Sequence, residues 1–291
     1  CDAFGTGFFY IPGTETCLQI GGEVRFGVSF GEDLVGGSSW DAATRARVHF
    51  DARNDTEYGT LQSFIQLQAI DDVAGGGDDG EDVGLRQAYI DIAGLRVGSF
   101  IGWWDDGIAG ESDTLSNFVR FNSIRYTYDG GSFSAGLSVD ELDGAGYVNN
   151  ELGVTGMVGG AFGGVNVQGL VAYDNGAEEW AARAIVTAEI GPGTLGLAGV
   201  WASDANAYYA EAEWSIAASY AAKVSEKLTI TPAVTYFSDV AFGSDDAWGA
   251  SLLAEYDVTT GLKASAAVTY YDLDVPNGDS WGGFVRLTRS F

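Results

Sequence analysis

The chain has 291 residues, of which 41 are Asp or Glu and 14 are Lys or Arg, giving a formal net charge of −27 at pH 7. Hydrophobic residues make up 46% of the chain and aromatic residues 13%, which excludes acidic disordered chains because these are poor in both. Binding to nucleic acid needs a basic surface, so the charge also excludes nucleic acid as a partner.

Alternation of apolar and polar residues dominates the chain, and a period of two is typical of β-strands with two different faces. From Leu18 to Phe30, every second residue is apolar or Gly, whereas Glu23 and Arg25 lie between them. The next run repeats the pattern, and its polar face consists of Arg45, Arg47, His49, Asp51 and Arg53.

About sixteen such segments follow one another, and they are expected to begin near residues 17, 40, 58, 82, 94, 122, 132, 150, 164, 179, 194, 208, 227, 247, 261 and 280. An even number of alternating segments, each long enough to cross a bilayer when tilted, is typical of outer-membrane barrels. The sequence therefore predicts an all-β fold: a 16-stranded antiparallel transmembrane β-barrel that forms a single domain over residues 1–291.

The connections between these segments alternate between short and long. The long ones are Gly31–Ser39, Asp71–Glu81, Ser99–Phe121, Asp140–Asn149, Asp174–Glu178, Ser203–Ala207, Ser238–Asp246 and Asp272–Asp279, and they hold more than half of the 41 acidic residues. The short connections hold only Asp55, Glu57, Asp129 and Glu226. Outer-membrane barrels have short periplasmic turns and longer external loops, so we expect both chain termini on the periplasmic side.

Aromatic residues on the apolar faces fit the same interpretation. Tyr126, Tyr128, Trp180, Trp214, Trp248, Tyr256 and Tyr270 lie mostly near strand ends, where the aromatic girdles of membrane barrels occur. A soluble β-sandwich also alternates, but it needs a second layer to cover its apolar face. The sequence offers no helix for that purpose, and a bilayer is the expected surroundings.

Two segments resemble a known family. The first is CDAFGTGFFYIPGTETCL at Cys1–Leu18, and the second is RQAYIDIAGLRVG at Arg86–Gly98. Both are similar to segments of alphaproteobacterial general porins of the rhizobial and brucella-like branch. The resemblance implies a homotrimeric, water-filled channel of the bacterial outer membrane for passive diffusion of ions and small hydrophilic solutes. It also implies that residues 1–16 form a periplasmic hook and that lipid and lipopolysaccharide surround the barrel.

The longest connection, Ser99–Phe121, lies where such porins fold a pore-constricting loop into the barrel. Two adjacent Trp residues, Trp103 and Trp104, suit packing against an inner wall better than exposure to water. The predicted acidic side of the constriction consists of Asp105, Asp106, Glu111 and Asp113. The alternatives are a solvated external loop and, because paired Trp residues could bind sugars, a substrate-selective sugar or anion porin of the same fold.

The alternation places most basic residues on the inward face, because an Arg facing lipid would cost about 2–4 kcal/mol at mid-depth. The predicted basic wall consists of Arg25, Arg45, Arg47, Arg53, Arg96, Arg125 and Arg286, and Arg183 and Lys263 share this face. Opposed to an acidic loop, such a wall creates a transverse field that disfavours apolar solutes. The same residues can also pair with inward Glu23, Asp51 and Glu189 as a structural network.

Three further features complete the sequence predictions. Carboxylates at Asp78, Asp79, Glu81 and Asp82 could bind a structural Ca²⁺, although they lack EF-hand spacing and a solvated loop is the equal alternative. No obligatory cofactor is expected. Cys1 and Cys17 recur in the family segment, which implies a disulfide that fastens the hook, with a lipid anchor on Cys1 as the alternative. The single histidine, His49, faces inward among arginines, so no catalytic triad or two-histidine metal site is expected.

Overall fold

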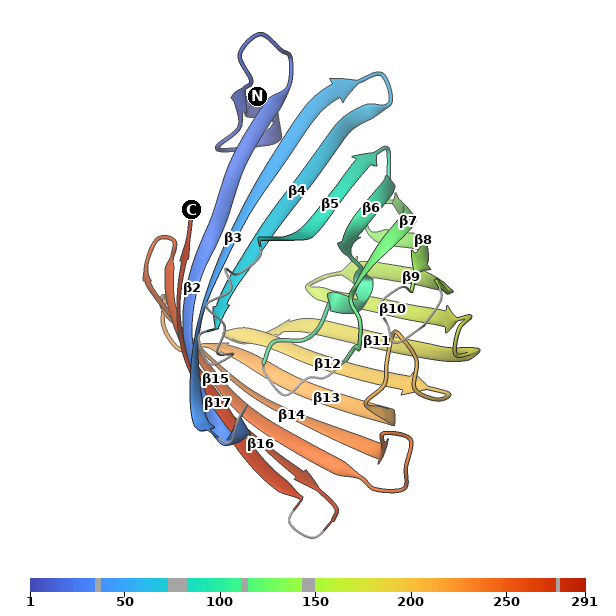
Figure 1. The fold of residues 1–291 in the computed structure, drawn as a ribbon, viewed down its shortest axis with the longest axis vertical. Helices are drawn as coiled ribbons and strands as arrows, with labels where there is room; N and C mark the ends of the chain where they lie inside the picture. Colours follow the sequence, from blue (N-terminus) through green and yellow to red (C-terminus); the bar gives the residue numbers. More distant parts are fainter. Residues whose placement is uncertain (35–37, 73–82, 111–114, 143–149, 276–277) are drawn as a thin grey trace.

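The computed structural model describes residues 1–34, 38–72, 83–110, 115–142, 150–275 and 278–291. Within these ranges the chain forms one closed barrel of sixteen strands, β2 to β17, each paired antiparallel with its neighbours in the sequence (Figure 1). Pairing of β17 with β2 joins the last strand to the first. The predicted 16-stranded antiparallel barrel is therefore confirmed.

The strands are β2 (Cys17–Leu34), β3 (Ser38–Thr56), β4 (Gly59–Asp72), β5 (Gly84–Ile92), β6 (Leu95–Ile101), β7 (Arg120–Asp129), β8 (Phe133–Glu141), β9 (Leu152–Phe162), β10 (Val165–Asp174), β11 (Glu179–Ile190), β12 (Gly193–Ala202), β13 (Ala212–Lys223), β14 (Leu228–Val240), β15 (Ala247–Thr259), β16 (Leu262–Leu273) and β17 (Asp279–Ser290). Their first residues lie within four residues of the predicted starts. Two predicted boundaries are nevertheless wrong in an informative way.

The first concerns the predicted long connection Gly31–Ser39. Strand β2 continues to Leu34 and β3 already begins at Ser38, so most of this segment is a hairpin that extends the barrel. The second concerns the strand expected from residue 208, which begins at Ala212. Apolar alternation through Tyr208 and Tyr209 resembles a strand, but the structure uses these two side chains inside the barrel instead.

The two faces of the strands differ as the alternation predicts. On β2, Ile20, Val24 and Phe26 point outward and are about half exposed, whereas Glu23 and Arg25 point inward. The predicted girdle residues Tyr126 and Trp214 are also outward and exposed. The outer surface is thus apolar and the lumen polar, which is the arrangement that a bilayer outside and water inside require.

Both chain ends lie at the end of the barrel that carries the short turns (Figure 1). A 3-10 helix, η1 (Asp2–Phe4), and a short strand, β1 (Phe9–Tyr10), form an N-terminal hook that pairs with the start of β2. A disulfide joins Cys1 to Cys17 with a Cα–Cα distance of 5.3 Å, as the resemblance implied. Among the described helices, none is long and apolar enough to cross a membrane.

The main hydrophobic core lies inside the barrel, against one side of its wall. Its members come from the segment after β6, from the inner faces of β7 to β13 and from the connection between β12 and β13; they include Trp104, Ile108, Leu115, Leu142, Leu170, Ile185, Val200, Tyr208 and Tyr209. A barrel that contains only water in its lumen has no hydrophobic core there. The buried cluster therefore identifies the segments that fold into the lumen.

Candidate functional site

The segment between β6 and β7 folds into the barrel, and its described residues, 102–110 and 115–119, are called the constriction loop below. A hydrogen bond from Gly102 N to Val119 O of 2.7 Å closes its base. A 3-10 helix, η4 (Trp103–Asp105), begins it, and Figure 1 shows this helix within the outline of the barrel. The inward-folded loop predicted over 99–121 therefore exists, and its described residues can be placed individually.

Trp104 and Arg183 attach the start of the loop to the barrel. The indole of Trp104 is 2% exposed, and its Nε1 donates to Thr155 Oγ1 on β9 at 3.3 Å. The guanidinium of Arg183, on β11 and 3% exposed, donates to the carbonyl oxygens of Trp103 at 2.6 Å and Trp104 at 2.7 Å. Arg183 also donates to Leu115 O at 3.4 Å, so one side chain contacts both ends of the loop.

The loop follows the wall from β9 to β14. Ile108 is buried against the wall, and Gly110 lies beside Ala233 of β14. The φ of Gly110 is +119°, and a Cβ at this position would lie 2.8 Å from the Cβ of Ala233, so only glycine fits here. The described residues of the loop thus lie against the β9–β14 side of the lumen.

Two of the four predicted acidic residues lie on the described part of the loop. Asp105 and Asp106 are exposed, and Asp106 Oδ2 accepts a hydrogen bond from Gln168 Nε2 at 2.6 Å. Glu111 and Asp113 lie outside the described residues. The acidic residues Asp78, Asp79, Glu81 and Asp82 also lie outside them, so calcium binding stays a prediction.

Several basic residues pair with inward acids on β2 and β3. Arg45 forms an ion pair with Glu23, and Arg47 lies 3.7 Å from the same carboxylate while donating to Gln68 at 2.7 Å. Nearer the short-turn end, Arg53 pairs with Asp51 at 2.7 Å. Glu189, also considered as a partner, accepts a hydrogen bond from Thr194 instead. The structural network is thus present, and the same side chains face the lumen.

Closure of the barrel brings Arg25 of β2 and Arg286 of β17 together. Both line a cavity of about 300 Å³, along with Lys263 and Glu255, which form an ion pair of 3.0 Å. The guanidinium carbon of Arg286 lies 3.3 Å from the centre of the Phe284 ring. Three cations therefore share one recess of the wall, where β17 pairs with β2.

Arg96 and Arg125 occupy a different position from the other predicted basic residues. Arg96 pairs with Asp91 at 2.8 Å and lies over the Tyr89 ring at 4.1 Å. Arg125 is 9% exposed and stacks between the rings of Phe100 at 4.6 Å and Trp103 at 4.8 Å. These two arginines support the root of the constriction loop rather than the surface opposite to it.

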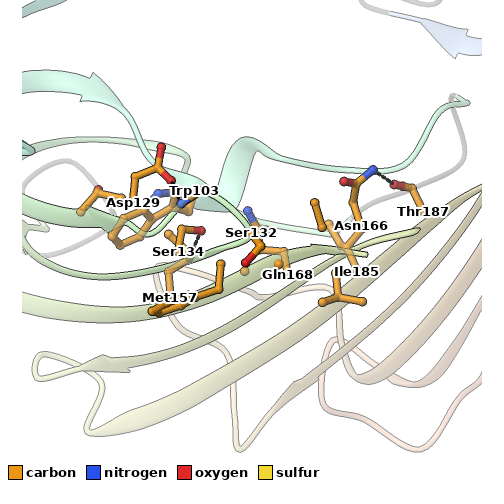
Figure 2. A pocket seen from close by; sticks show the side chains of 16 residues that line it. Trp103, Asp129, Ser132, Ser134, Met157, Asn166, Gln168, Ile185 and Thr187 are labelled. Carbon is orange, nitrogen blue, oxygen red and sulfur yellow. Dashed lines mark hydrogen bonds between the residues drawn. The ribbon is translucent and has the colours of Figure 1, made fainter. Parts of the chain in front are cut away.

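A second cavity, of about 410 Å³, lies between the constriction loop and the short-turn ends of β8 to β11 (Figure 2). Trp103 and Met157 line one part, and Asn166, Gln168 and Thr187 line another. Polar groups here bond to one another, as in Asn166 Nδ2 to Thr187 Oγ1 at 3.4 Å. The cavity thus lies between the loop and the barrel wall, with polar and apolar side chains in its lining.

A family profile described as "Porin subfamily" matches residues 1–281. The chain belongs to the porin family. Three curated relatives each align with 100% of this porin: putative outer membrane protein y4fJ of Sinorhizobium fredii (46% identical, 88% of the relative covered), outer membrane protein IIIA of Rhizobium leguminosarum bv. viciae (42%, 84%) and porin Omp2b of Brucella neotomae (30%, 89%). The resemblance deduced from the two motifs is confirmed.

Solved structures give the same fold. The outer membrane channel DcaP of Acinetobacter baumannii matches with a TM-score of 0.73 at 14% identity, covering 97% of this porin and 99% of that chain. A mutant of the Rh. blastica porin matches with a TM-score of 0.67 at 18% identity, covering 94% and 100%. These structures agree in fold, and membership of the porin family makes the protein a general diffusion channel of the bacterial outer membrane.

Sequence reasoning missed two parts of this site. It placed Arg183 on the inward face but did not predict its contact with the constriction loop. Arg183 and Trp104, which are hydrogen-bonded, are 79 residues apart in the sequence. It also treated Ser203–Ala207 as an external loop, whereas Ala207, Tyr208 and Tyr209 are buried inside. The only available signal was a pair of tyrosines at an expected strand start.

Proposed function

We propose that this porin passes ions and small hydrophilic solutes without binding any one solute through an aromatic surface. The observation that carries the proposal is that both Trp side chains of the constriction loop already contact the barrel wall. Trp104 is buried against β9, and Trp103 stacks on Arg125. The exposed groups at the start of the loop are Asp105 and Asp106, which attract water and ions.

Charge on the two sides of the lumen supports the same function. The loop presents carboxylates, and the opposite side presents Arg45, Arg47 and Arg25 with Glu23 among them. A transverse field across water orients dipolar solutes and opposes apolar ones, since these cannot compensate for displaced hydration. The filter then acts on size and polarity, which is what a diffusion channel needs.

Planar-bilayer conductance combined with liposome swelling tests this proposal. We expect an ohmic open channel and swelling rates that fall smoothly with the size of neutral sugars. A general channel should keep its conductance when any one of these sugars is added at millimolar concentration. Concentration-dependent block by one sugar, with others of equal size inactive, would contradict the proposal and favour the sugar-selective alternative.

A second candidate, preference for small anions, is favoured by the recess that Arg25, Lys263 and Arg286 share. Three cations line it with Glu255, the one carboxylate among its lining residues. Reversal potentials in a salt gradient distinguish the candidates. Anion preference that disappears in Arg286→Gln supports this second function, and cation preference in the unmodified porin refutes it.

The assembly that we propose is a homotrimer with both chain termini in the periplasm. One solved relative in fold, OmpT of Vibrio cholerae, is described as a trimer form. The acidic long connections would then face outward, near lipopolysaccharide, where residues 71–82 could bind Ca²⁺. Native mass spectrometry in detergent tests the trimer, and protease access to an N-terminal tag in intact cells tests the orientation.

A further inference from the structure

A second segment folds into the barrel, and its contacts point to a role at the constriction. This segment, residues 203–211 between β12 and β13, is called the second inward loop. Ala207, Tyr208 and Tyr209 are at most 2% exposed, so their side chains are fully enclosed by protein. Figure 1 shows that this connection turns back toward the constriction loop instead of extending away from the strand ends.

Tyr208 occupies a site whose shape is set by neighbouring strands. Its ring lies 5.6 Å from the ring of Trp104 and 5.6 Å from that of Phe121. Its hydroxyl donates to Asp140 Oδ2 on β8 at 2.8 Å. Gly153 of β9 makes room for it, because a Cβ at this position would lie 2.0 Å from the Tyr208 hydroxyl oxygen.

Asp140 depends on that hydroxyl. The carboxylate is 4% exposed, and in the described part of the chain no Lys or Arg forms an ion pair with it. Its other donors are the hydroxyls of Ser123 and Ser138, each at 2.6 Å, and of Thr155 at 3.4 Å. A buried charge that relies on neutral donors loses heavily when one of its short hydrogen bonds is removed.

The second inward loop also pairs directly with the constriction loop. Asn117 N donates to Tyr208 O at 2.8 Å, and Phe118 N donates to Ala207 O at 2.9 Å. The side-chain amide of Asn117 adds a bond to Asn206 O at 3.2 Å. At its other end the constriction loop reaches the same carboxylate, because Thr155 accepts from Trp104 and donates to Asp140.

We propose that Tyr208 is a positioning residue of the constriction. Its hydroxyl anchors the second inward loop to Asp140, and this loop in turn holds the constriction loop against the wall. The role rests on the proposed function, in which that loop limits the passage of solutes. Tyr208 does not touch the solute path itself; it acts by setting the fraction of time that the constriction loop stays in place.

The first test uses thiol labelling and does not require conduction. Ile108→Cys, at a loop position only 7% exposed, gives one reactive thiol, because the two native cysteines form the disulfide. A maleimide reaches this thiol only when the loop leaves the wall, so the labelling rate reports the detached fraction. In the Ile108→Cys background, Tyr208→Phe should raise the rate about tenfold, which corresponds to about 1.4 kcal/mol.

Tyr209→Phe is the matched control, because its hydroxyl donates to Ser215 of the adjoining strand at 2.8 Å and not to Asp140. Gly153→Ala, which closes the site of the Tyr208 hydroxyl, should increase labelling as Tyr208→Phe does. In planar bilayers, Tyr208→Phe should add open-channel noise that Tyr209→Phe lacks. Equal labelling rates for the two Phe variants would overturn the inference, whereas an unmodified porin that does not conduct would refute the proposed function alone.

Discussion

Replacing Arg183 should release the constriction loop while leaving the barrel intact. We choose Arg183→Met, which keeps an unbranched chain of similar length in the lumen but removes the guanidinium. In the unmodified porin this group donates to the carbonyls of Trp103 at 2.6 Å and Trp104 at 2.7 Å, with a longer bond to Leu115. Those carbonyls would then lie against the wall without a charged donor.

The expected effect follows from the two short bonds. A hydrogen bond that involves a charged group contributes about 1.5–3 kcal/mol, so the pair contributes about 3 kcal/mol at the low end of that range. A change of about 3 kcal/mol shifts the equilibrium between attached and detached loop by about two orders of magnitude. The backbone pairing of β11 with β10 and β12 does not involve the Arg183 side chain, so we expect the barrel to remain folded.

Single-channel recording and liposome swelling measure the outcome. Arg183→Met should show larger and noisier conductance, and sugars near the exclusion limit should enter faster. Lys263→Met is the matched control: it removes one lumen cation and introduces the same residue, but Lys263 pairs with Glu255 of the neighbouring strand and has no hydrogen bond to the described residues of the loop. If both variants change conductance equally, lumen charge explains the result and the anchoring role of Arg183 is refuted.

Three other outcomes are expected. The double variant Arg45→Gln and Arg47→Gln should shift the reversal potential in a salt gradient toward cation preference, whereas Arg289→Gln, at the outer face of the short-turn end, should not. Reduction of the N-terminal disulfide should make the hook susceptible to chymotrypsin without changing conductance. The disulfide links residues 16 apart and contributes about 3 kcal/mol to the stability of the folded hook alone. Unchanged cleavage after reduction would contradict this prediction. Burial raises the pKa of Tyr209 to about 12, and burial followed by the nearby Asp140 carboxylate raises the pKa of Tyr208. The second inward loop, with both tyrosine hydroxyls protonated, therefore keeps its full stability below about pH 10 and loses stability as the pH rises further. Channel noise should increase above that pH, and it should increase less in Tyr208→Phe, which lacks one of the two hydroxyls.

The barrel itself could be predicted because its determinants are local. Each strand separates lipid from water, so successive side chains must alternate in polarity, and the run from Leu18 to Phe30 carries that pattern in the sequence alone. Short turns and acidic long connections alternate because successive connections of an antiparallel barrel lie at opposite ends of it. Even the shared recess of Arg25 and Arg286 follows, because closure of a sheet makes its first and last strands neighbours.

The two strand boundaries that were predicted wrongly lie where the polarity of the residues does not distinguish a strand from a connection. Gly31–Ser39 was predicted as a connection, yet β2 continues to Leu34, which pairs with Ser38 of β3. Tyr208 and Tyr209 directly precede the alternating residues Ala210, Ala212 and Trp214, so from sequence they resemble the start of a strand. Only the space inside the barrel decides that they fold inward.

The sequence by itself determined which residues face water within the lumen and which face lipid. It placed Arg125 and Arg183 correctly on the inward face, but it could not separate an arginine that lines the solute path from one that holds a loop. That distinction depends on contacts between segments far apart in the chain, such as Arg183 with Trp103 and Tyr208 with Asp140. Polarity is a property of each residue, whereas complementary shape and hydrogen-bond geometry arise only when the barrel closes around both loops.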